Sequence, residues 1–393
     1  MKVLLLESES RTLLTGIGSS KMTRLRLNPS LLKVPHYIAG RSIEELQEEY
    51  GLTEVVKLAS NENPFGLSPL ALNAFRDALK DAHRYPGIAD RLLRRRLASH
   101  YNSRYGTSFT EHAFLVGNGA QDVLRMITHA LIFEGGEAVI CTPTFPMYRI
   151  FVEEFGGKCV AVPHKDYRYD LRGVANAITP DTRLVFICNP NNPTGTLVSR
   201  GEVEAFAKQV PPSVLLVFDE TYYDFVDNPN SSKVVDLASQ ELDNVVLVRS
   251  FSKIYGMANL RVGYALGAKE TIHYLSHARM VFNTGDPVLY AAIAALEDHE
   301  HVERVRKLIA EEKRFLYEGF ARLGLSYVPT TANFILLVTL RSDARAIYEG
   351  LLRRGVAVRP VDSFGIENAI RVTIGKREEN ERLLEALGEV LGR

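Results

Sequence analysis

The stretch SFSKIYGMANLRVGY, residues 250–264, follows the apolar run VVLV and decides how the rest of the chain is interpreted. A continuous apolar run without strict alternation predicts a strand that is buried on both faces. Ser250, Ser252 and Lys253 therefore lie just beyond a strand end, with Arg261 a little further on. A lysine taken alone is usually a surface residue. Hydroxyls and a guanidinium, however, are groups that hold a phosphate, so the stretch predicts an anion site.

Similar apolar runs occur on both sides of this stretch and predict a mostly parallel sheet. They are AFLV (113–116), AVICTP (138–143), LVFICNP (184–190), VLLVFDE (214–220) and RVGYAL (261–266). Amphipathic segments at 121–133 and 201–209 are suited to the crossover helices that connect parallel strands. The pattern predicts an α/β fold with a large domain whose mostly parallel central sheet is flanked by helices.

The pattern changes after Asp286 and predicts a smaller α+β domain. A long helical stretch through 301–324 leads to apolar runs at 333–339, 356–361 and 369–375, and a charged amphipathic helix at 377–392 follows. We therefore place the large domain at 60–285 and build the small domain from 33–59 and 286–393. Residues 1–32 are interpreted as an N-terminal lead, either disordered or a misassigned start.

Composition favours a small-molecule enzyme over a protein that binds nucleic acid or membrane. The 393 residues carry 47 basic and 47 acidic side chains, and no block of Lys or Arg stands out. The opening VLLL is followed at once by Glu7, which is too short for a signal-peptide core, and no run reaches the roughly 20 apolar residues of a spanning helix. The 3 cysteines form no CxxC pair. A cytoplasmic protein without a metal site is expected.

Polar motifs follow the predicted strands, at the edge where open α/β sheets bind ligands. They are GNGAQ (117–121), Thr144 with Phe145, NPNNPTG (189–195), DETYY (219–223) and SFSK (250–253). GNGAQ and NPNNPTG are each compatible with plain turns. Asp219 is compatible with a structural salt bridge, since a carboxylate at the end of an apolar strand needs a partner. Their convergence at one sheet edge favours a binding crevice.

Together these motifs resemble those of the class I and II aminotransferases of pyridoxal-5′-phosphate (PLP) fold type I. Within that superfamily the chain is most similar to the histidinol-phosphate aminotransferase branch, from about Lys33 to its end. The resemblance rests on the order of KLASNENPFG (57–66), RYPG (84–87), PTFPMY (143–148), NPNNPTG, DETYYDF (219–225), SFSKIYGMANLRVGY and AIRVTIG (369–375). Such a spaced series is far more specific than any single motif.

The resemblance implies a catalytic role for three residues. Lys253 would form the Schiff base with PLP and then act as the base that moves a proton at the substrate's Cα. Asp219 would pair with the protonated pyridine nitrogen and keep the ring an electron acceptor. Tyr222, together with Asn192, would hydrogen-bond the phenolic oxygen of the ring.

The resemblance also implies a set of cofactor contacts. Phe145 would stack on the pyridine, where the family more often has Tyr or Trp. The phosphate would be held by Ser250, Ser252, Arg261 and the start of a helix at Gly119, Ala120 and Gln121. Tyr85 corresponds to a tyrosine that in relatives reaches the phosphate of the other subunit's cofactor, which implies a homodimer with shared sites.

The substrate side is implied to contain Tyr37, Asn61, Asn333, Arg359 and Arg371. Arg371 matches the arginine that grips a substrate carboxylate or phosphate, and Arg359 would assist it. A turn residue is the alternative interpretation of Asn61. Two departures from the family pattern, His36 beside Tyr37 and Asn259 in place of glycine, leave the cofactor residues intact.

These implications predict a PLP-dependent aminotransferase that passes an amino group to 2-oxoglutarate, with histidinol phosphate as the favoured donor. Closely similar sequences act on phenylalanine and tyrosine, so an aromatic aminotransferase is an alternative. A decarboxylase of the threonine-phosphate type would use the same cofactor residues. A ligand-sensing regulator carries a DNA-binding domain ahead of such a fold, and the short lead here is expected to leave no room for one.

Overall fold

The computed structural model describes residues 28–32, 34, 42–133, 135–226, 233–338 and 344–392. Its centre is a seven-stranded sheet in the order β2-β8-β7-β6-β5-β3-β4. The strands are β2 (Phe114–Gly117), β3 (Glu137–Thr142), β4 (Lys158–Pro163), β5 (Thr182–Cys188), β6 (Leu215–Asp219), β7 (Val245–Ser250) and β8 (Gly263–Gly267). Only β8 runs against its neighbours, β2 and β7. The predicted α/β fold with a mostly parallel sheet is confirmed.

Both faces of this sheet are covered, as the continuous apolar runs predicted. Along β5, Leu184, Phe186 and Cys188 pack into one apolar cluster, and Val185 and Ile187 pack into another. The first cluster lies under α5 (Ala120–Leu131), α6 (Met147–Glu154) and α10 (Lys269–Ser276). The second lies under α4 (Ala89–Tyr105), α7 (Leu171–Asn176), α8 (Arg200–Ala207) and α9 (Lys233–Asp236). Successive residues of a strand point to opposite faces, so every position had to be apolar.

Helix starts near the first strands are set by local capping. Ser68 Oγ accepts a hydrogen bond from the backbone N–H of Ala71, and Pro69 occupies the first position of α3 (Pro69–Ala78). Ser42 and Glu45 form a reciprocal capping box at α2 (Ile43–Tyr50). These short polar signals mark where each helix begins.

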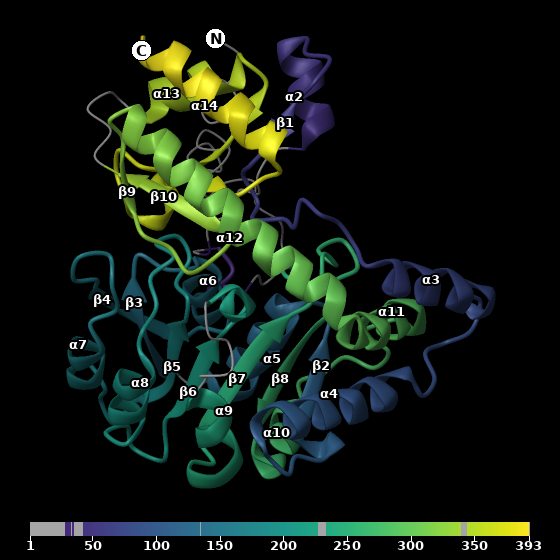
Figure 1. Cartoon of the computed structure of the whole chain (residues 1–393). Coiled ribbons are helices and arrows are strands. Elements are labelled where there is room, and N and C mark those ends of the chain that lie inside the picture. The colour runs from purple at the N-terminus through teal and green to yellow at the C-terminus, as the bar shows by residue number, and fades with distance from the viewer. Residues whose placement is uncertain are drawn as a thin grey trace, which may run out of the picture.

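A second, smaller unit stands above the large sheet in Figure 1. Its four-stranded sheet is antiparallel, in the order β12-β13-β10-β9. The strands are β9 (Ser326–Val328), β10 (Phe334–Val338), β12 (Arg359–Pro360) and β13 (Ile370–Thr373). A separate parallel pair joins β1 (Val56–Lys57) to β11 (Val356–Ala357). The early chain therefore contributes to this C-terminal unit, which has its own helices α13 (Ala344–Leu352) and α14 (Arg377–Leu391).

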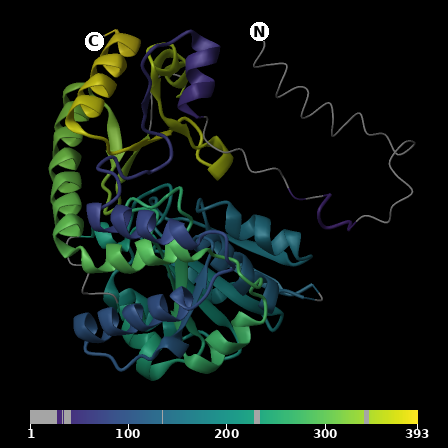
Figure 2. The ribbon, with the colours of Figure 1, turned by 90° about the vertical axis from the view of Figure 1, so that its right-hand side faces the viewer.

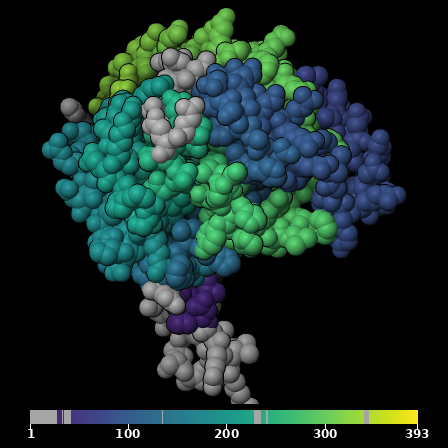
Figure 3. Space-filling model, turned by 90° about the horizontal axis from the view of Figure 1, so that it is seen from below, coloured from purple at the N-terminus to yellow at the C-terminus, as the bar shows by residue number. Residues whose placement is uncertain are grey.

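Two helices connect the units. α11 (Asp286–Glu297) packs against α3 and α4, and α12 (His299–Arg322) runs on from it beside α14. Figure 2 shows α12 extending from the large sheet to the upper unit. Seen from below, the surface consists mainly of blue, teal and green segments, which belong to the large unit (Figure 3). The two units form the predicted large and small domains, and the exact boundaries at 60 and 286 stay a prediction.

Two details differ from the sequence-based expectation. β4 was not predicted, because several of its residues are exposed or half-buried at the sheet edge and no continuous apolar run marks it. The run at 356–361 was expected to be one strand but is divided: β11 pairs with β1, while β12 pairs with β13. An apolar pattern indicates burial, and it does not specify which partner strand is used.

Candidate active site

Parallel strands bring the predicted cofactor residues to one sheet edge. Asp219 is the last residue of β6 and lies in register with Cys188, the last residue of β5. Ser250 is the last residue of β7, the next strand along. The loop with Asn192 follows β5, and Phe145 lies between β3 and α6. These predicted cofactor residues therefore lie at the same edge of the sheet, beyond the strand ends.

The Asp219 carboxylate is buried, with 5% of the residue exposed. Its Oδ1 accepts hydrogen bonds from the Thr221 hydroxyl at 2.6 Å and the Thr221 backbone N–H at 3.0 Å. Its Oδ2 accepts one from the Tyr148 hydroxyl at 2.8 Å. Burial raises the pKa of Asp219, while the bonds from Thr221 and Tyr148 and the charge of Lys253 act to lower it. A salt bridge was the alternative for this residue, and the described residues place no cation within ion-pair distance of it.

Lys253 points across the crevice to the chain that enters from the small domain. Its Nζ donates hydrogen bonds to the carbonyl oxygens of Ser60 at 3.2 Å and Asn61 at 3.1 Å. It also lies 5.5 Å from the centre of the Tyr222 ring. Burial lowers the pKa of Lys253 to about 7, and the positive charges of Arg371 and Arg261 act in the same direction. An amine with such a pKa is partly neutral near neutral pH and can act as a nucleophile and a base.

The residues predicted to hold a phosphate form a compact cradle. Arg261 Nη1 donates to the Ser252 hydroxyl at 3.3 Å, and the Ser252 backbone N–H donates to the Ser250 hydroxyl at 3.1 Å. Gly119, at φ +83, has no room for a side chain, because a Cβ there would lie 2.3 Å from Arg261 Nη2. Ala120 begins α5, whose first N–H groups have no partner within the helix. Backbone donors and a guanidinium thus face the same space.

A second wall of the crevice comes from both ends of the sequence. Asn61, 1% exposed, donates through Nδ2 to the Tyr222 hydroxyl at 3.0 Å. Its backbone N–H donates to Thr373 Oγ1 at 2.9 Å, and its carbonyl accepts from Asn333 Nδ2 at 3.1 Å. Asn61 has φ +54, a left-handed conformation that asparagine tolerates better than most residues. This conformation agrees with the turn interpretation of Asn61, and its place beside the substrate stays a prediction.

Arg371 links this wall to the loop after β5. Its Nη1 donates to Asn192 Oδ1 at 2.5 Å, and its Nη2 donates to the Ala59 carbonyl at 2.7 Å. Arg359 lies opposite Arg371 in the register of β12 and β13. Both guanidinium groups lie near the Phe364 ring, at 5.9 Å for Arg359 and 5.8 Å for Arg371. Two arginines therefore stand side by side at the edge of the crevice.

Among the described residues, the predicted contact Tyr85 is not brought to these cofactor residues. Tyr85 is 81% exposed and stacks on Phe282 at 4.8 Å. Tyr37 lies outside the described residues. Phe145 is close to the crevice and packs edge-on against Tyr148 at 5.6 Å.

Sequence reasoning missed two residues that contact Asp219. Thr221 lies inside the quoted motif DETYY, two positions after the carboxylate, a spacing at which a side chain can bond its neighbour's backbone. Tyr148 ends the quoted motif PTFPMY, three residues after Phe145, which lies just before α6. No local pattern in the sequence separates Tyr148 from an ordinary buried aromatic residue, so its contact with Asp219 is found only in the structure.

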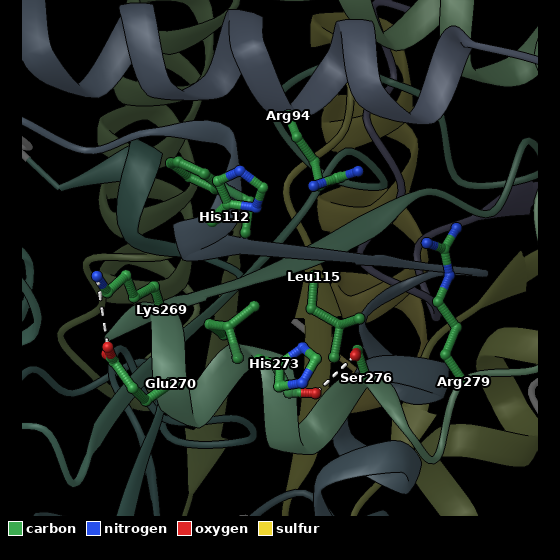
Figure 4. A pocket seen from close by; sticks show the side chains of 10 residues that line it. Arg94, His112, Leu115, Lys269, Glu270, His273, Ser276 and Arg279 are labelled. Atoms are coloured by element: carbon green, nitrogen blue, oxygen red, sulfur yellow. Dashed lines mark hydrogen bonds and ion pairs between the residues drawn. The ribbon is translucent and has the colours of Figure 1, made fainter.

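A separate pocket lies between α4, β2 and α10, with a volume of about 500 Å³ (Figure 4). Its labelled cations include Arg94, Lys269 and Arg279, and none of the predicted site residues lines it. Arg94 and Arg279 share the carboxylate of Asp90, at 3.0 Å and 2.9 Å. These arginines therefore connect α4 to the end of α10, and the candidate site is the crevice at Lys253.

Within the described ranges, no helix is both long enough and apolar enough to cross a membrane. The same part of the chain contains no group of three or more His, Cys, Asp or Glu residues that could hold a metal ion.

Comparison with known proteins identifies the family. Residues 53–387 match the family model described as aminotransferase class I and II. The chain belongs to the class I and II aminotransferases. It is 42% identical to a histidinol-phosphate aminotransferase of Moorella thermoacetica over 92% of each chain. It is 43% identical to one of Symbiobacterium thermophilum, over 91% of this chain and 96% of the relative.

Solved aminotransferase structures have the same fold. A histidinol-phosphate aminotransferase from Sinorhizobium meliloti, in complex with pyridoxal-5′-phosphate, superposes with a TM-score of 0.85 at 29% identity, over 95% of this chain and 99% of that chain. An aspartate aminotransferase from Thermus thermophilus gives 0.79 at 25% identity, over 93% and 100%. The predicted fold type I and membership of the aminotransferase family are confirmed.

Proposed function

We propose that this aminotransferase uses PLP to transfer an amino group from histidinol phosphate to 2-oxoglutarate. The observation that carries the proposal is the Lys253 amine, with its pKa lowered to about 7, in the same crevice as Asp219 and Arg371. The relatives at 42% and 43% identity bear the name histidinol-phosphate aminotransferase, which supports this donor. Such an activity belongs to histidine biosynthesis in the cytoplasm.

The chemistry of the residues fits PLP at both ends. The missing side chain of Gly119 lets the Arg261 guanidinium, which bonds Ser252, approach the start of α5, an arrangement that suits a phosphate with backbone donors from Ala120 and Gln121. At the other end the buried Asp219 would gain a cationic partner from a protonated pyridine. Phe145 would cover the ring, and Asn192 and Tyr222 would contact its phenolic oxygen.

When bound, PLP supplies an electron sink for the bond that breaks at the substrate's Cα. Lys253 Nζ would hold the cofactor and then accept the Cα proton and return it, for which a pKa about 7 is suited. Asp219 would stay ionised and fix the charge of the ring nitrogen. The protein's part is therefore proton transfer at Nζ and electrostatic support at the far end of the ring.

Arg371 would bind an anionic group of the substrate. Its contacts with Asn192 and the Ala59 carbonyl fix the plane of the guanidinium before any ligand arrives. Arg359, its neighbour across the strand pair, would assist with a second anionic group. Asn61, Asn333 and Tyr37 would border the pocket. A dicarboxylate such as 2-oxoglutarate and a phosphate ester such as histidinol phosphate both suit two adjacent arginines.

A homodimer with shared sites is part of the proposal. Large apolar residues are exposed around Tyr85: Met280 at 73%, Val281 at 79%, Phe282 at 55% and Ile88 at 54%. Such a patch favours burial against a second copy. Mixing subunits that carry Lys253→Ala with subunits that carry Tyr85→Ala should restore activity, because hybrid dimers would contain one intact site. No recovery, with hybrids shown to form, would contradict shared sites.

The donor is tested by a panel of initial rates with 2-oxoglutarate as the acceptor. We expect the highest kcat/KM with histidinol phosphate, and lower values with phenylalanine and tyrosine. Threonine phosphate should give no carbon dioxide. Preference for an aromatic amino acid, or carbon dioxide release without amino transfer, would replace the proposed donor or reaction by the corresponding alternative.

A further inference from the structure

Tyr148 is a buried polar residue that the proposed chemistry does not yet use. It lies in the first turn of α6 and is 0% exposed. Its ring stacks on Phe186 of β5, with centroids 4.9 Å apart and planes 6° apart, and packs edge-on against Phe145. These contacts fix the ring from two sides, so its hydroxyl has a defined direction.

That hydroxyl donates to Asp219 Oδ2 at 2.8 Å, while Thr221 donates twice to Oδ1. Each oxygen of the carboxylate is therefore held by a donor from a different segment: α6 on one side, and the turn after β6 on the other. With both oxygens held, the carboxylate cannot rotate without breaking a buried hydrogen bond, which is costly.

We propose that Tyr148 is a positioning residue, which aims the Asp219 carboxylate and keeps it ionised for a cationic ring nitrogen; this inference rests on the proposed function. Tyr148 acts through Asp219 and has no contact of its own with the reacting atoms in this scheme. The site therefore includes a residue of the apolar cluster between the sheet and α6, which supports Asp219 from behind.

The groups around Asp219 explain why such a donor is needed. The titratable side chains facing it are Tyr148 from α6, Cys188 from β5, Tyr222 after β6 and Lys253 after β7. Burial raises the pKa of Asp219 and favours a neutral acid, which would be a poor partner for a cation. Burial and the charge of Asp219 also raise the pKa of Tyr148, so its hydroxyl keeps the proton that it donates.

The test compares Tyr148→Phe with Tyr101→Phe. Tyr101 is 2% exposed, and its hydroxyl pairs with that of Tyr264 at 2.9 Å, so both variants remove one buried hydroxyl and its hydrogen bond. Two quantities are measured: the carbon-13 NMR titration of the Asp219 carboxyl in cofactor-free protein, assigned with Asp219→Asn, and the dissociation constant for PLP.

Tyr148→Phe should raise the titration midpoint of Asp219 by about one pH unit and weaken PLP binding about tenfold, while Tyr101→Phe should change neither. Thr221→Val should shift the midpoint in the same direction, since it removes the other hydroxyl. A folded Tyr148→Phe protein with the wild-type midpoint and the wild-type dissociation constant would overturn the inference. If wild type itself binds no PLP, the proposed function fails, and the Asp219 titration still decides the role of Tyr148.

Discussion

The cofactor side and the substrate side of the crevice are assembled in different ways. On the cofactor side, Asp219 and Ser250 are the last residues of neighbouring strands, and Lys253 follows three residues after Ser250. On the substrate side, Asn61 bonds Thr373 across 312 residues of sequence, and Arg371 bonds Asn192 across 179. One sheet therefore places the first group, whereas docking of two chain segments places the second. Changes on the cofactor side should affect PLP binding and chemistry, and changes on the substrate side should mainly affect substrate affinity.

The largest expected effect comes from Asp219→Asn. We expect the rate of amino transfer to fall by a factor of about a thousand, since the ring nitrogen would lose its anionic partner. The free energy of unfolding of cofactor-free protein should fall little, because a costly buried charge is removed. Steady-state assays measure the rate of amino transfer, and urea unfolding measures the free energy of unfolding.

Glu220, the next residue, is the matched control. It is 0% exposed, and it accepts a hydrogen bond from Arg249 at 2.5 Å on the side of the strand away from Asp219. Glu220→Gln should lower the free energy of unfolding by about 2 kcal/mol or more, because the Arg249 charge loses a buried partner, yet PLP should still bind. If Asp219→Asn and Glu220→Gln weakened PLP binding equally, Asp219 would have no special role in holding the cofactor.

Arg371→Lys probes the substrate side. A lysine cannot reach Asn192 and the Ala59 carbonyl with a planar, bidentate group, so we expect the KM for 2-oxoglutarate to rise about tenfold. The dissociation constant for PLP should change by less than about twofold. Arg382→Lys, at an exposed arginine of α14, serves as the control. A large loss of PLP binding in Arg371→Lys would show that the two sides are not separable.

A further expected effect is a pH dependence of stability that comes from Lys253. Its pKa is lowered from 10.5 to about 7 in the folded protein, mainly by burial. Between these values the unfolded chain binds more protons than the folded one, so stability increases with pH across that window. Relative to Lys253→Met, cofactor-free wild type should gain free energy of unfolding as pH rises from about 7 to 10. A parallel pH profile for the two proteins would mean that Lys253 keeps an ordinary pKa.

The sequence predicted most of the large sheet, because β5, β6 and β7 are buried on both faces and so are apolar at nearly every position. It did not predict β4 at the edge, where burial is partial. On the cofactor side, nearness to a strand end made Asp219 and Lys253 recognisable. On the substrate side, no local pattern reports that Asn61 meets Tyr222 across 161 residues. Tyr148 was not predicted for a different reason. A buried aromatic residue in the first turn of a helix usually belongs to the core, and the sequence does not show that its hydroxyl contacts Asp219.

The identity of the lysine that carries the cofactor tests the central claim most directly. Protein incubated with PLP is reduced with borohydride, digested and mapped by mass spectrometry. We predict the pyridoxyl-phosphate group on the peptide that contains Lys253, together with loss of visible absorbance, and neither in Lys253→Ala. Modification of another lysine, or no incorporation into folded wild type, would contradict the account.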